Sequence, residues 1–144
     1  MKNLTQLFVI FLLSVAVPLH ANAGVTVIGN PANGMQSLTP VEADQLFLKK
    51  LKKAGKFSAQ IVDLPEGSAV RAALYQKISN KSKVQMKSYW ARFMFTGAGN
   101  LPDELPDDGA VIEFVKSNQG AIGYIGSSSG KPVGVTVLLS LDDN

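Results

Sequence analysis

The fold of this chain is decided by the stretch Ala59-Gln60-Ile61-Val62-Asp63-Leu64-Pro65-Glu66-Gly67-Ser68-Ala69-Val70-Arg71. Its first half is short and apolar, which predicts a buried strand. Pro65 and Gly67 then predict a turn, and Ser68 is a favoured residue for capping the helix that follows. The stretch therefore predicts a strand, a turn and a helix in direct succession.

The start of that helix carries groups that can hold an anion. The first turn of a helix has unpaired N–H donors and the positive end of the peptide dipole, and Gly67 lets the backbone approach a ligand closely. An oxyanion site at Gly67 and Ser68 is one hypothesis. The alternative is that Ser68 is a helix cap without a ligand, as it is at most junctions of this type.

Residues 1–23 have the pattern of a secretory signal peptide. Lys2 supplies the positive end, residues 7–17 an apolar core, and Ala21-Asn22-Ala23 a cleavage site of small residues. The apolar run is shorter than the roughly 20 residues that span a bilayer. We expect cleavage after Ala23 and a soluble periplasmic protein, with a retained anchor as the alternative. Residues 24–144 are enough for a single domain.

The composition excludes several classes of chemistry. The chain has no Cys, and its one His, His20, lies in the predicted signal peptide. Disulfides, thiol nucleophiles, Ser-His-Asp catalysis and the usual zinc sites are therefore not expected. The net charge of +3 is small, and Lys2 belongs to the signal peptide, so the sequence does not indicate a nucleic-acid partner. We predict a protein that is not an enzyme, with no catalytic residues, no metal and no cofactor.

Helices and strands alternate along the rest of the chain. Thr39-Pro40-Val41-Glu42 predicts a capped helix with an apolar face and, on its opposite side, a lysine run that is most simply a solvated surface. A later aromatic stripe predicts a helix whose Trp90 is buried. Further strands are expected over 25–28, 121–125 and 133–141, and a further helix over 109–117. The apolar faces of the two helices consist of Ala43, Leu46, Phe47, Leu51 and Ala54, and of Met86, Tyr89, Trp90, Phe93 and Met94.

This alternation predicts an α/β sandwich, in which helices cover a sheet of about four strands. The last two strands are expected to pair antiparallel. Gly120, Gly123 and Gly126 lie in or beside a strand, where close packing of the backbone is the simplest interpretation. Gly97-Ala98-Gly99 lacks the third glycine and the preceding strand of a dinucleotide-binding site, so no nucleotide is predicted.

Three pieces in this order resemble the periplasmic phosphate-binding proteins of ABC transporters, and more closely their short, single-lobe relatives. The pieces are Leu38-Thr39 with Leu46-Phe47-Leu48, the turn Asp63-Leu64-Pro65-Glu66-Gly67-Ser68, and Gly120-Ala121-Ile122-Gly123-Tyr124-Ile125. The resemblance spans residues 25–125. It implies a three-layer α/β fold like one lobe of a type 2 periplasmic binding protein.

In that family, an Arg-Ser-Asp-Gly-Ser-Gly-Thr turn holds phosphate. Gly67 and Ser68 match this turn, whereas Leu64 stands where the family has its arginine. The resemblance therefore implies that Arg71 supplies the charge if its side chain folds back toward the turn, with Thr96 as a candidate neighbour. For Thr96, the alternative is a loop residue that caps local backbone.

The resemblance implies an exported protein that binds phosphate or a similar oxyanion and is related to the substrate-binding components of ABC transporters. The alternative is a ligand-free adaptor or sensor that uses the same fold to contact a membrane protein or a second copy of itself. The absence of the arginine at Leu64 and of an opposing lobe favours this alternative.

Overall fold

The structure is a computed structural model that describes residues 23–142. The predicted signal peptide lies outside the described residues except for Ala23, so its cleavage stays a prediction. None of the described helices is long and apolar enough to cross a membrane.

In chain order, the elements are β1 (Val25–Gly29), the 3-10 turn η1 (Pro31–Asn33), α1 (Pro40–Phe47), β2 (Lys53–Ala54), β3 (Phe57–Ser58), β4 (Gln60–Asp63), α2 (Ala69–Ser79), α3 (Lys83–Phe95), β5 (Asp103–Glu104), α4 (Asp108–Ser117), β6 (Ala121–Gly126), the 3-10 turn η2 (Ser127–Ser129) and β7 (Thr136–Leu141).

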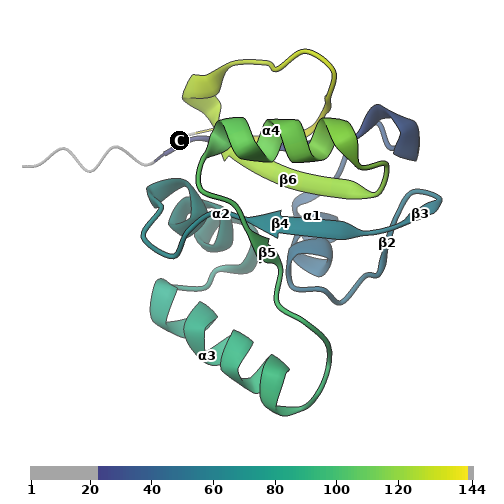
Figure 1. Cartoon of the computed structure of the whole chain (residues 1–144). Helices are drawn as coiled ribbons and strands as arrows, with labels where there is room; N and C mark the ends of the chain where they lie inside the picture. The colour runs from purple at the N-terminus through teal and green to yellow at the C-terminus, as the bar shows by residue number, and fades with distance from the viewer. Residues whose placement is uncertain (1–22, 143–144) are drawn as a thin grey trace, which may run out of the picture.

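A mixed five-stranded sheet in the order β5-β4-β6-β1-β7 forms the centre of the molecule (Figure 1). β4 runs parallel to β5 and β6, whereas β1 runs antiparallel to both β6 and β7. The predicted α/β class is confirmed. The predicted pairing of the last two strands is wrong, because β1 lies between them. All five residues of β1 are buried, which suits a strand with a neighbour on each side.

Helix α4 covers one face of this sheet and crosses in front of β6 in Figure 1. Gly123 permits this contact, because a Cβ atom there would lie 2.6 Å from Val111 of α4 and 2.9 Å from Val62 of β4. The side-chain amide of Asn30, just after β1, donates to the carbonyls of Val115 and Lys116 at 2.8 and 3.0 Å. The close packing predicted around Gly123 is therefore confirmed, and it fixes α4 against two strands.

Helices α1 and α2 pack on the other face. The ring of Phe47 meets that of Tyr124 edge to face, with centroids 5.5 Å apart. The predicted capping box of Thr39 and Glu42 is present. The helix ends at Phe47, so it is shorter than the apolar pattern indicated.

The predicted inward face of α1 is wrong at its last two positions. Lys49 has a positive φ of 57°, and the chain turns there into the small β2-β3 hairpin. Leu51 is consequently 42% exposed, while Ala54 is buried in β2 rather than in a helix. The predicted run of lysines begins at Lys49, so it follows the helix instead of lying along its opposite side.

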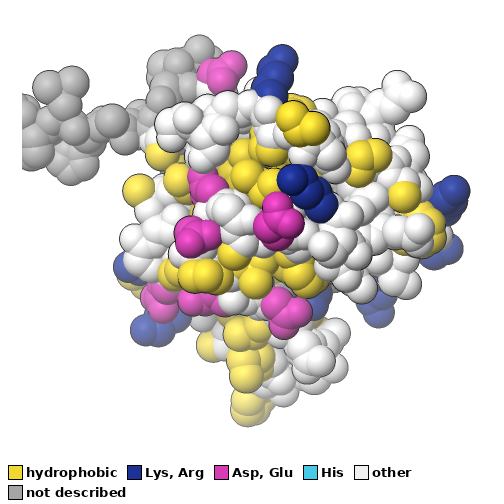
Figure 2. Space-filling view, turned by 45° about the horizontal axis from the view of Figure 1, so that its top comes forward, with side chains coloured by type: hydrophobic (Ala, Val, Ile, Leu, Met, Phe, Trp, Pro, Cys, Tyr) yellow, Lys and Arg dark blue, Asp and Glu magenta, His cyan; other side chains and the backbone are white. Residues whose placement is uncertain are grey.

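Helix α3 projects from the body of the molecule, below the sheet in Figure 1. Trp90 is 6% exposed, which confirms the predicted burial, and its ring packs edge to face against Tyr89 and Phe93. Met94 was expected to face inward, but it is 59% exposed because the last turn of the projecting helix has little to pack against. Phe95 is 93% exposed, and Figure 2 shows hydrophobic side chains on this projection.

Candidate functional site

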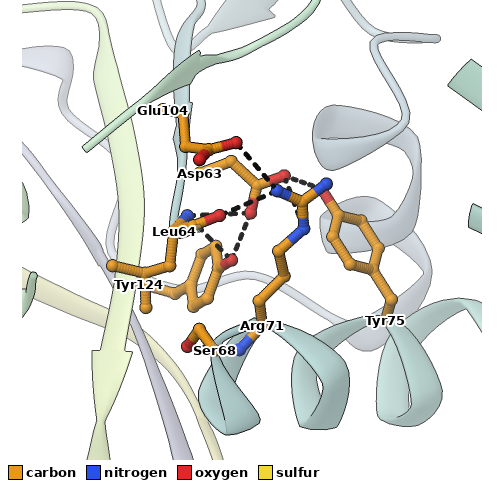
Figure 3. Close-up of polar contacts among 7 residues, drawn as sticks. All are labelled: Asp63, Leu64, Ser68, Arg71, Tyr75, Glu104 and Tyr124. Carbon is orange, nitrogen blue, oxygen red and sulfur yellow. Dashed lines mark hydrogen bonds and ion pairs between the residues drawn. The ribbon is translucent and has the colours of Figure 1, made fainter. Parts of the chain in front are cut away.

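A buried carboxylate marks the point where β4 ends and the turn before α2 begins. Asp63 is 2% exposed, and three donors surround it (Figure 3). The Tyr75 hydroxyl donates to Oδ2 at 2.7 Å, the Leu64 N–H donates to Oδ1 at 3.0 Å, and the Tyr124 hydroxyl also donates to Oδ1. The carboxylate thus ties α2 and β6 to the end of β4.

The sheet register brings these groups together. Ile61 of β4 pairs with Ile122 of β6, and side chains two residues apart on a strand share a face, so Tyr124 lies on the same face as Ile122. Asp63 pairs in turn with Glu104 of β5. Residues far apart in the sequence therefore meet at one edge of the sheet.

Burial sets the protonation of this cluster. Desolvation raises the pKa of Asp63 above its ordinary value, and the nearby Arg71 and the hydrogen bonds from the two tyrosines oppose that rise. Burial and the adjacent Asp63 carboxylate raise the pKa of Tyr75 and of Tyr124. Both tyrosines stay protonated at neutral pH and act as hydrogen-bond donors.

The side chain of Arg71 folds back toward the end of β4, the condition on which its predicted role depends. Its Nη1 donates to the carbonyl of Leu64 at 2.8 Å and pairs with Glu104 at 3.3 Å. Its Nε lies 3.6 Å from Oδ2 of Asp63. The positive charge is therefore shared with two carboxylates, of which only that of Glu104 is substantially exposed.

Backbone donors remain available at the start of α2. The Ser68 hydroxyl oxygen caps the helix by accepting the N–H of Arg71 at 3.2 Å. Within residues 23–142, no atom accepts a hydrogen bond from the N–H groups of Gly67, Ala69 or Val70. Three unpaired N–H groups and one hydroxyl thus lie within a single turn of backbone.

Thr96 lies elsewhere. It forms the C-cap of α3, where its hydroxyl donates to the carbonyl of Phe93 at 3.2 Å. The end of a helix carries the negative side of the peptide dipole, which does not attract anions. The structure therefore brings Gly67, Ser68 and Arg71 together in one turn, and it does not bring Thr96 into contact with them.

Sequence reasoning missed Asp63, Tyr75, Tyr124 and Glu104 as parts of this site. Asp63 and Tyr124 were inside the quoted motifs, and an acid at the end of an apolar strand is a signal that could have found the first of them. Tyr75 and Glu104 have no such signal, because only the sheet register and the packing of α2 bring them to Asp63.

The chemistry available at this site is that of hydrogen bonding to an anion. Within the described part of the chain, no group of acidic, histidine or cysteine side chains could hold a metal ion. The donors are backbone N–H groups, one hydroxyl and one guanidinium, which are the groups that bind oxyanions at helix starts.

No protein-family model matches the sequence, and no curated protein matches it. Solved structures match its fold. A protein from Clostridium perfringens, described as a phosphate ABC transporter substrate-binding protein and solved with bound phosphate, superposes with a TM-score of 0.63 at 19% identity, over 81% of this chain and 44% of that chain. An ABC-type phosphate transport receptor from Vibrio cholerae gives 0.60 at 13% identity, over 81% and 45%. PstS from Borrelia burgdorferi gives 0.59 at 15% identity, over 81% and 46%.

The chain therefore has the fold of part of a phosphate ABC transporter substrate-binding protein, and the predicted fold class is confirmed. It spans less than half the length of each of these structures. At these identities the likeness is one of fold.

Proposed function

We propose that this chain is an exported, periplasmic protein without enzymatic activity that binds phosphate or a similar oxyanion at the start of α2. The observation that carries this proposal is the set of unpaired N–H groups at Gly67, Ala69 and Val70 beside the Ser68 hydroxyl. The fold supports it, because a protein of the same fold has been solved with bound phosphate. The chain would then be related in function to the substrate-binding components of ABC transporters.

Arg71 supplies charge to this site only in competition with Glu104. Their ion pair of 3.3 Å joins a mostly buried guanidinium to a half-exposed carboxylate, and an incoming oxyanion would replace that carboxylate. Leu64 contributes no charge. We therefore expect an affinity no tighter than about micromolar, and one that weakens as the salt concentration rises.

The second candidate function is a ligand-free adaptor or sensor that contacts a membrane protein or a second copy of this chain. The exposed hydrophobic residues of α3 favour it, since Val84 is 74% and Phe95 is 93% exposed. Large exposed apolar side chains that are grouped on one element are typical of interaction surfaces.

Isothermal titration of residues 24–144 with phosphate, sulfate and simple carboxylates separates these functions. Binding should weaken about three- to tenfold in Ser68→Ala, which removes one hydroxyl donor. The matched control is Ser82→Ala, because Ser82 caps α3 with the same 3.2 Å geometry and lies outside the proposed site. Each change removes a helix cap that contributes about 1 kcal/mol, so stability is measured alongside.

A second pair of variants tests the role of Arg71. Glu104→Gln should tighten phosphate binding, because it removes the carboxylate that competes for the guanidinium. Asp103→Asn, which changes an exposed carboxylate in the same strand, should have little effect.

If the wild-type protein gives neither heat nor a thermal shift with millimolar phosphate or sulfate, the oxyanion proposal fails and the adaptor function replaces it.

A further inference from the structure

A groove of about 300 Å³ lies between α2 and α3, and Arg71 of α2 is one of the residues that line it. Its apolar wall is formed by Tyr75 of α2, by Trp90 and Met94 of α3, and by Leu101 from the following loop. A volume of this size is at the lower end of the range for pockets that hold small molecules, which is about 300–1,000 Å³.

More basic than acidic side chains line the groove. Lys81, Lys83 and Lys87 line it, and none of them forms an ion pair with a carboxylate of the described residues. Of the two acidic residues in the lining, Glu104 is already paired with Arg71, and Glu66 lies exposed in the turn before α2. The groove therefore carries surplus positive charge that an anionic group can neutralise.

On the surface of α3, the positively charged side chains and the apolar side chains of the groove lie in different halves of the helix. Lys83, Lys87, Trp90 and Met94 follow one another at helical spacing, so they form a single stripe along the helix. The two lysines occupy its first half, and the two apolar residues its second half. A molecule lying along this stripe meets positive charge at one end and an apolar surface at the other.

Trp90 adds an unused hydrogen-bond donor. Its side chain is buried, and its Nε1–H has no acceptor among the described residues. A buried donor without a partner costs free energy, and most such donors in folded proteins are paired. An oxygen at the inner end of a head group held by Lys87, one helical turn before Trp90, would supply the missing partner.

We propose that this groove binds an organic anion with one anionic head group, a carboxylate or a phosphate monoester, and a compact apolar body. The head group lies against Lys83 and Lys87, and the apolar body lies along Trp90 and Met94. This site adjoins the proposed oxyanion site at the start of α2, since Arg71 and Glu104 also line the groove, and it differs from that site by its apolar wall.

Trp90 is the single tryptophan of the chain, so its fluorescence reports directly on the groove. The probe is hexyl phosphate, with 1-hexanol and inorganic phosphate as matched partial ligands. Hexyl phosphate should change the Trp90 emission saturably, and 1-hexanol should bind at least about tenfold more weakly, because it lacks the charged head. Inorganic phosphate should leave the emission unchanged, whether or not it binds at the start of α2.

Variants locate the binding. Replacing both Lys83 and Lys87 with alanine should weaken binding of hexyl phosphate about tenfold or more, and the loss should shrink at high salt. Lys131→Ala, an exposed lysine outside the groove, should change nothing. The proposal is overturned if hexyl phosphate gives no saturable change, if 1-hexanol binds equally well, or if Lys131→Ala weakens binding as much as the double variant. An emission that depends on protein concentration and not on hexyl phosphate would show that a second copy covers the groove, and would also overturn it.

Discussion

Asp63 is the residue on which the geometry of the site depends. Its buried carboxylate accepts the hydroxyls of Tyr75 and Tyr124 and holds the Nε of Arg71 within 3.6 Å. A carboxylate placed in this way fixes the direction in which the guanidinium points. It does so at a cost, because a buried charge is expensive unless it is fully compensated.

This cost predicts a pH dependence. Burial raises the pKa of Asp63 in the folded protein above the value of about 3.9 for an unfolded chain. The stability that Asp63 contributes is therefore fully present below about pH 3.9 and is lost as the pH rises through the folded pKa. The free energy of unfolding of the wild-type protein, relative to that of Asp63→Asn, should fall as the pH rises above about 4, and it should level off once the pH has passed the folded pKa of Asp63.

Urea denaturation at several pH values measures this difference, and the asparagine variant is the matched control because it has the same shape and no titrating group. A wild-type advantage that grows with pH would mean that the folded pKa of Asp63 is lowered, which contradicts the account.

At the scale of elements, α3 depends for its place on a small number of side chains. Trp90 is buried beside Tyr89 and Phe93, and the Tyr89 hydroxyl donates to the carbonyl of Leu48 at 2.7 Å. The other end of the helix projects into solvent. The attachment of the whole helix therefore rests mainly on its inward aromatic residues.

Trp90→Ala should lower the free energy of unfolding by about 3–5 kcal/mol, because it leaves a large cavity between α3 and the body of the molecule. Phe95→Ala removes an aromatic ring from the same helix at a position that is 93% exposed, so it should change stability by less than about 0.5 kcal/mol. Circular dichroism during urea denaturation checks both, since Trp90 fluorescence is lost in the first variant. Equal effects of the two changes would show that Trp90 is not a core residue.

Local signals predicted the elements better than their pairing. The capping box at Thr39 depends on residues within three positions of each other, and it is present as expected. The position of β1 between β6 and β7 depends on contacts about a hundred residues apart, which the local pattern does not encode. The sequence pattern likewise did not predict that α1 ends at Phe47, because Lys49 adopts a backbone conformation that is unusual for lysine.

The same distinction applies to the site. Gly67 and Ser68 were identified from the turn chemistry of adjacent residues. The direction of the Arg71 side chain depends on Asp63 and Glu104, which approach it through the register of the sheet. The sequence alone led to the proposed donors, but it could not show that the guanidinium of Arg71 is already paired with the carboxylate of Glu104.

At the scale of the whole molecule, the chain spans less than half the length of the solved proteins that share its fold. At the start of α2, Gly67 and Ala69 are exposed in the described structure. An anion held there keeps part of its hydration, which limits the strength of each hydrogen bond. Weak, salt-sensitive binding is the behaviour that this geometry favours.

The central claim is that the unpaired backbone N–H groups at the start of α2 bind an oxyanion. Titrating isotopically labelled protein, residues 24–144, with phosphate while recording amide resonances tests it most directly. The account predicts saturable shifts concentrated at the amides of Gly67, Ala69 and Val70, and smaller ones in Ser68→Ala. Amide resonances that stay unchanged there, or shifts confined to residues 81–87, would contradict it.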